Sequence, residues 1–169
     1  MDPSSVRDLQ ASAAGHIRHG DVTAEAAEGD ELIRVCRVAT QAASRHMTPH
    51  YLKALDDSIE QACSLPSRYD WDRKATAHAE IVNLLADAAG DPALAVLTRN
   101  VPGQLHELMI AVGPVTSGII AGSRRRLLAL LRAGDADGAA REIEQHIKGL
   151  FWIRRLSYDP ARDTGDIAV

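Results

Sequence analysis

The stretch HAEIVNLLADAAGDPAL, residues 78–94, carries a helical stripe, a glycine stop and an immediate restart. Apolar positions recur in it every three or four residues, which is the spacing of one helix face. Gly90 is typical of a helix end, and Asp91 followed by Pro92 is typical of a new helix start. His78 lies on the apolar stripe. The sequence therefore places an imidazole on a face that is expected to meet the core.

The rest of the chain repeats this helical pattern. The clearest start signal is Thr48 as N-cap with Pro49 in the first turn. Because each helix carries a single apolar stripe to bury, we predict an all-α fold, an antiparallel bundle of six or seven helices. The predicted helices cover residues 6–17, 24–45, 49–63, 70–89, 93–121 with breaks at its prolines and glycines, 123–133 with Ser123 as cap, and 136 to beyond 150.

Length and composition favour one aliphatic domain. The 169 residues suffice for a single core, and 46% hydrophobic with 25% charged residues is globular composition. Only two Trp, three Tyr and one Phe occur, so the core is expected to consist of packed Ala, Leu, Ile and Val side chains. We expect a helical extension over residues 1–29, the bundle over residues 30–156, and a flexible tail over residues 157–169.

Several classes of protein are disfavoured by charge and cysteine content. A net charge of −4 argues against a surface that grips nucleic acid throughout. Cys36 and Cys63 lack metal-site spacing and are too few for a disulfide framework. The first residues are acidic and polar, unlike a signal peptide, and no apolar run approaches the roughly 20 residues that span a bilayer. We expect a cytoplasmic protein that does not bind membranes.

Three segments in order point to a family. AASRHMTPHYLKALDDSIEQA (42–62), VNLLADAAGDPAL (82–94) and SRRRLLALLRAGDADGAAREIEQHI (123–147) resemble the C-terminal effector-binding domain of FadR-type regulators in the GntR family. The resemblance covers about residues 30–156. It implies the helical bundle of that domain, a small-molecule effector in its interior and pairing into a homodimer.

In that family, one Asp and three His often bind a divalent metal that helps to hold a carboxylate effector. The resemblance places His78 at the Asp position and His146 at the last His position, but Val82 and Arg124 at the other two. Two ligand positions are thus lost, whereas a stable zinc site normally has at least three protein ligands. We expect no metal and no cofactor.

Three residues are the main candidates for a site. His78 and His146 lie on the apolar stripes of two helices, and a buried imidazole without a partner costs about 1–3 kcal/mol. Each could be a core histidine satisfied by a neighbour, but together at inherited pocket positions they indicate a binding site. Arg124 could replace the charge of the metal and bind an acid by two hydrogen bonds. His106 is a weaker candidate for the cavity wall.

Arg124 belongs to a run of three arginines. Arg124, Arg125 and Arg126 are predicted to open a helix, where the positive end of the helix dipole disfavours cations by about 0.3–1 kcal/mol. For Arg125 and Arg126 the preferred interpretation is a solvated side chain that pairs with an acid on a neighbouring helix.

Two functional hypotheses follow, together with a third interpretation. The first is a small-molecule sensor or regulator that binds an organic acid or related metabolite through His78, Arg124 and His146. The second is a metabolic enzyme that reuses the pocket, with His78 or His146 as general base. The family's winged helix-turn-helix is not recognisable before residue 30, so we expect no direct DNA binding from this chain. The third interpretation is that the chain is a piece of a longer repressor.

Overall fold

The computed structural model describes residues 26–157. The first of these, residues 26–45, form a helix. The chain divides between Glu31 and Leu32, and the larger unit begins at Leu32. From residue 32 to 45 the buried side chains recur at helical spacing, among them Leu32, Cys36 and Ala43. This helix is tied to the last helix of the same unit, because Arg37 donates a hydrogen bond of 2.8 Å to Glu144.

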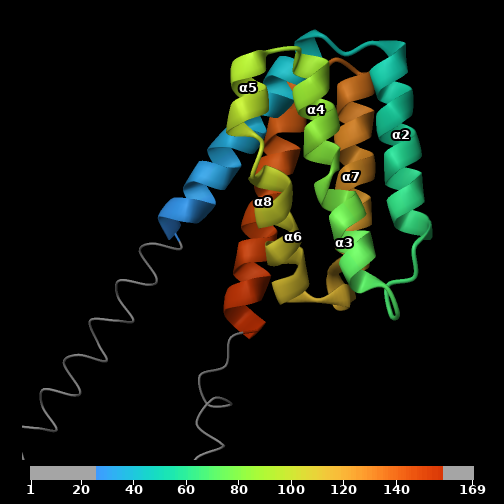
Figure 1. Cartoon of the computed structure of the whole chain (residues 1–169), viewed down its shortest axis with the longest axis vertical. Coiled ribbons are helices and arrows are strands. Elements are labelled where there is room, and N and C mark those ends of the chain that lie inside the picture. The colour runs from blue at the N-terminus through green and yellow to red at the C-terminus, as the bar shows by residue number, and fades with distance from the viewer. Residues whose placement is uncertain (1–25, 158–169) are drawn as a thin grey trace, which may run out of the picture. The chain divides into compact units, whose positions relative to one another are not determined.

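The described chain is built from helices and contains no strand within residues 26–157, which confirms the all-α prediction (Figure 1). After residue 45 the elements are α2 (Pro49–Ser64), α3 (Trp71–Ala79), α4 (Ile81–Ala89), α5 (Pro92–Leu97), α6 (Val101–Val112), the 3-10 turn η1 (Pro114–Thr116), α7 (Ser117–Arg132) and α8 (Ala136–Ser157).

Local signals set most of these boundaries. The hydroxyl of Thr48 accepts a hydrogen bond from the backbone N–H of Tyr51 at the start of α2, and Asp91 accepts one from Ala93 at the start of α5. Between α7 and α8, Gly134 has φ +71°, a left-handed conformation that side-chain-bearing residues rarely adopt. Asp135 then accepts a hydrogen bond from Gly138, as expected of a cap.

Two predicted boundaries were wrong. The predicted helix 70–89 is divided at Glu80, whose carbonyl accepts from Asn83 three residues later in a locally tightened turn. Helix α7 begins at Ser117 and not at Ser123, because η1 already carries the chain into helical geometry. Arg124 and its two neighbours therefore lie inside α7, and the dipole penalty expected of its first turn does not apply to them.

The long helices pack in a closed sequence of neighbours. Helix α2 contacts α7, α7 contacts α8, α8 contacts α6, α6 contacts α3, and α3 returns to α2. Figure 1 shows α2, α7 and α8 running alongside one another, with α3 and α6 on the side toward the viewer. The faces turned inward carry the aliphatic core, which includes Leu55, Ile59, Leu105, Met109, Leu127 and Ile147. Helices α3, α7 and α8 carry the three main candidate residues, and α6 carries the weaker candidate His106.

The predicted outer segments fall mostly beyond the described part. Residues 1–25 of the expected extension and residues 158–169 of the expected tail lie outside it. Within residues 26–157, no single helix is long and apolar enough to cross a membrane. Two consecutive segments, Val101–Val112 and Pro114–Arg132, are long and apolar enough for a membrane span only when they are taken together. The chain bends by 103° between them.

A buried lysine fixes helix α3 against the end of α2. Lys74 is 5% exposed, and its ammonium donates to the carbonyl oxygens of Cys63 and Leu65 at 3.2 and 2.8 Å. These carbonyls belong to the last turn of α2 and the residue that follows it, where helical partners are lacking. A side chain one turn before His78 therefore caps a neighbouring helix.

Replacing Lys74 by Met keeps the length of the side chain and removes its three donors. We expect the free energy of unfolding to fall by about 1–3 kcal/mol, because two buried carbonyl groups lose their partner. Urea unfolding at neutral pH measures the change. Lys53→Met is the control, since Lys53 is exposed and pairs with Asp57 on its own helix. Equal stability of the two variants would contradict the capping role.

Candidate functional site

Three polar side chains from three helices are buried in the bundle. His78 in α3 and Arg124 in α7 are 0% exposed, and His146 in α8 is 6% exposed. Helical spacing puts them there. Arg124 follows Ile120 by four residues, and His146 precedes Leu150 by four, so each shares a face with core residues.

The polar atoms of these side chains lack hydrogen-bond partners. Within residues 26–157, none is found for either ring nitrogen of His78, for Nε2 of His146, or for any of the three guanidinium nitrogens of Arg124. Buried polar groups in proteins are almost always hydrogen-bonded. Six nitrogen atoms in these three neighbouring side chains therefore lack the hydrogen bonds that buried polar groups normally make within the protein.

The three groups act on one another electrostatically. Burial lowers the pKa of His78 to about 3, and the positive charge of Arg124 adds to this effect. Burial and then the charge of Arg124 also hold the pKa of His146 well below its usual value. Both imidazoles are therefore neutral at pH 7. We call His78, Arg124 and His146 the buried cluster.

Arg124 keeps its charge in this setting. Burial lowers its pKa to about 10, while the neighbouring Cys36 and Glu142 act in the opposite direction. The Cys36 thiol does not balance the charge at neutral pH, because burial raises its own pKa to about 12. The buried cluster thus holds one positive charge that no hydrogen-bonded carboxylate within residues 26–157 neutralises.

Glu142 is the acidic residue next to the cluster, and its carboxylate is already bound. It lies one turn before His146 on α8 and accepts hydrogen bonds from Nε and Nη2 of Arg126 at 3.1 and 3.0 Å. Burial alone would raise the pKa of Glu142. The hydrogen bonds from Arg126 and the charge of Arg124 nevertheless hold this pKa below its usual value. Glu142 was not predicted as a site residue, although its spacing of four from His146 places it on the same face.

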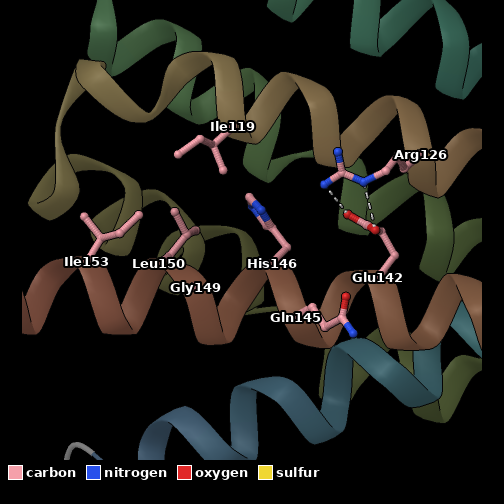
Figure 2. Close-up of a pocket in the computed structure, with 8 residues that line it drawn as sticks. All are labelled: Ile119, Arg126, Glu142, Gln145, His146, Gly149, Leu150 and Ile153. Atoms are coloured by element: carbon pink, nitrogen blue, oxygen red, sulfur yellow. Dashed lines mark hydrogen bonds and ion pairs between the residues drawn. The ribbon is translucent and has the colours of Figure 1, made fainter.

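Next to the cluster, a hollow of about 130 Å³ lies between α7 and α8. Figure 2 shows Arg126 and Glu142 at one end of it, His146 in the middle, and Ile119, Leu150 and Ile153 at the other end. His146 thus belongs both to the buried cluster and to the wall of a hollow. We call this feature the α7–α8 hollow.

The other predicted site residues lie elsewhere or are paired. His106 is not part of the cluster: its side chain is partly exposed, and its Nε2 lies 2.9 Å from Asp72 at the start of α3. The preferred interpretation of the remaining arginines is confirmed, because Arg125 pairs with Glu60 on α2 and Arg126 with Glu142 on α8.

The residues of the cluster do not fit the family's metal. Val82, at one position where the resemblance leads us to expect a ligand, is 1% exposed and packs in the core. Arg124, at the other, brings a positive charge that would repel a divalent cation. No group of three or more His, Cys, Asp or Glu within residues 26–157 is placed to hold a metal ion. The arrangement suits an anion better than a cation.

The low pKa values predict a specific loss of stability in acid. The unfolded chain binds protons on His78 and His146 below pH about 6.5, whereas the folded chain does not until far lower pH. Stability is therefore full above pH about 6.5 and falls as the pH drops toward 3, by up to about 1.4 kcal/mol per pH unit for each histidine. Urea unfolding at pH 7, 6 and 5 measures this slope.

The variant His78→Gln should reduce this slope by the contribution of one histidine, which is up to about 1.4 kcal/mol per pH unit. The control His46→Gln, at an exposed histidine, should leave it unchanged. Equal slopes in the native protein and His78→Gln would show that His78 is not kept neutral by the fold.

Comparison with known protein families matches the FCD domain over residues 36–149. No curated protein and no solved structure matches the chain. The matched segment contains all three residues of the buried cluster and begins at Cys36 beside it. FCD domains bind small-molecule effectors in GntR-family regulators. With its matched segment covering most of an all-α bundle, this chain belongs to the FCD domain family.

Proposed function

We propose that this protein binds a small carboxylic acid at the buried cluster and acts as a metabolite-responsive regulatory domain. The observation that carries the proposal is the fully buried guanidinium of Arg124, which has no hydrogen-bond partner within residues 26–157. A buried cation without a partner costs several kcal/mol. A carboxylate would supply the missing negative charge and could accept two parallel hydrogen bonds from the guanidinium.

The two imidazoles suit the same ligand. A neutral imidazole has one N–H donor and one acceptor nitrogen, so His78 and His146 can each donate to a carboxylate oxygen while adding no charge. A low pKa makes an imidazole a poor proton acceptor, and acid–base catalysis near neutral pH needs a pKa near 7. The pKa of about 3 for His78 therefore favours binding over the catalytic alternative.

The wider role follows from the family and from composition. We propose that the protein works in the cytoplasm as a homodimer, as the resemblance to FadR-type effector domains implies. The free thiols Cys36 and Cys63 suit a reducing compartment. Because the chain carries a net charge of −4, we propose that it contacts no DNA itself. Sedimentation equilibrium would distinguish a single chain from a dimer.

Small carboxylates should stabilise the protein, and their amides should not. A ligand present at 100 times its Kd adds about 2.7 kcal/mol, which corresponds to about 5–10 °C in Tm for a chain of this size. Thermal unfolding with acetate, butyrate, benzoate and succinate, against the corresponding amides, measures the effect. Arg124→Met should abolish it, whereas Arg125→Met should retain it.

A Tm shift that is equal in both arginine variants would contradict binding at the buried cluster. Proton NMR of each acid after incubation with the protein tests the catalytic alternative. Unchanged spectra support a binding domain, and consumption of the acid that depends on His78 or His146 would support an enzyme.

Without ligand, Arg124→Met should make the protein more stable. Replacing an uncompensated buried charge by an apolar side chain of similar length removes its desolvation cost, so the free energy of unfolding should rise by about 1–4 kcal/mol. Urea unfolding of extensively dialysed protein measures the change. Arg125→Met is the matched control and should differ little from the native protein. Destabilisation by Arg124→Met would show that the guanidinium is satisfied in the folded chain.

A further inference from the structure

Glu142 is a neighbour of two arginines of α7, one exposed and one buried. Figure 2 shows its carboxylate beside Arg126, whose Nε and Nη2 donate to its two oxygens at 3.1 and 3.0 Å. The side chain of Arg126 is 61% exposed, whereas that of Glu142 is 12% exposed. Arg124, two residues earlier on α7, is fully buried. Glu142 therefore adjoins one cation in solvent and one cation in the core.

The neighbours of Glu142 on its buried side lack hydrogen-bond partners. Arg124 makes no hydrogen bond through its three guanidinium nitrogens, and Oγ of Ser123, the residue before it, is also unpartnered in the part of the chain that the structure describes. Ser123 is buried, and after Arg126 its hydroxyl is the next group that lowers the pKa of Glu142 against the effect of burial. Buried donors without an acceptor are unfavourable. An inward turn of the Glu142 side chain would bring such donors an acceptor.

The charges of Arg124 and Glu142 already act on each other. Burial lowers the pKa of Arg124, and Glu142, after Cys36, acts in the opposite direction. Both oxygens of Glu142 are nevertheless bound by Arg126. An ion pair with an exposed arginine is weak because solvent screens it, whereas opposite charges attract each other more strongly in the core. Arg126 thus holds, by two hydrogen bonds, a carboxylate that the buried guanidinium also attracts.

We propose that Arg126 is a positioning residue, which holds Glu142 at the edge of the bundle and thereby keeps Arg124 free for a ligand. When Arg126 is removed, Glu142 turns inward and pairs with Arg124. Its carboxylate then takes the place of the carboxylate of the ligand in the proposed function, on which this inference rests. In such a variant the protein's own carboxylate competes with the ligand for one guanidinium.

A set of variants without ligand tests the position of Glu142 by itself. Arg124→Met is made in the native chain and in Arg126→Met, and urea unfolding at pH 7 measures the midpoint shift that it causes in each. The midpoint should rise in the native chain, because an uncompensated charge is removed. In Arg126→Met it should fall by about 1 M, because Glu142 then loses its buried partner. A shift that is equal in both backgrounds, or more favourable in Arg126→Met, would overturn the proposal.

Two controls identify Glu142 as the cause of the change in sign. With Glu142→Gln present in both backgrounds, Arg124→Met should shift the midpoint equally. Arg125→Met is the matched arginine control, since Arg125 also pairs with a glutamate of a neighbouring helix, Glu60 on α2. In Arg125→Met, Arg124→Met should raise the midpoint as it does in the native chain. A general weakening of the contact between α7 and α8 would lower every midpoint without changing the effect of Arg124→Met.

Titration calorimetry with acetate, butyrate, benzoate and succinate tests the consequence for the ligand. For each acid that the native chain binds, Arg126→Met should weaken binding about tenfold, because the acid must displace Glu142 from Arg124. Adding Glu142→Gln to Arg126→Met should restore the native affinity, and Arg125→Met should retain it. A loss of affinity that Glu142→Gln does not restore would overturn the proposal.

Two further variants keep the test decisive if Arg126→Met folds poorly. Arg126→Gln keeps a polar side chain at this exposed position and should weaken binding as Arg126→Met does. Arg126→Lys keeps the cation, so its affinity should stay within about threefold of the native value. Native affinity in Arg126→Gln would overturn the proposal. Failure of every acid to bind the native chain would refute the proposed function, whereas the urea measurements would still decide where Glu142 lies.

Discussion

The uncompensated positive charge of Arg124 is the constraint on which the site depends. It lies inside α7 among Ile120, Leu127 and Leu128, where an apolar residue would pack without any desolvation cost. Its neighbours either stay neutral, as the two histidines and Cys36 do, or have their charge committed elsewhere, as Glu142 does. A buried charge that lowers the stability of the folded protein in this way is typical of a functional site.

We propose that the same charge explains why two positions differ from the metal ligands that the family resemblance assigns to them. A metal requires several ligands in a fixed geometry, whereas a guanidinium brings its own charge and donors on one side chain. Once Arg124 supplies the cation, position 82 has no ligand to provide, and Val82 can join the aliphatic core. On this proposal, the covalently attached guanidinium of Arg124 takes the place of a bound ion.

The sequence predicted the helical fold because its boundaries are marked by local chemistry. Thr48, Asp91 and Gly134 act within one turn of chain, and each produced the boundary expected of it. The start of α7 and the break at Glu80 were missed, because a 3-10 turn and a tightened carbonyl contact leave little trace in residue type. Helical periodicity also placed His78 and His146 on inward faces, whereas an inward Arg124 was expected only from the family resemblance. Spacing along one helix does not reveal how side chains of different helices meet. The Arg126–Glu142 pair, the His106–Asp72 pair and the α7–α8 hollow depend on that geometry.

The anchoring of α3 does not depend on the side chain at position 78. Lys74 holds this helix to two carbonyl groups after α2, and the indole N–H of Trp71 donates to the carbonyl of Met109 in α6. Neither attachment involves the side chain at position 78. The backbone at position 78 is thus held by contacts that do not depend on its own side chain. The placement of α3 and the chemistry of the interior are therefore set by different residues of the same helix.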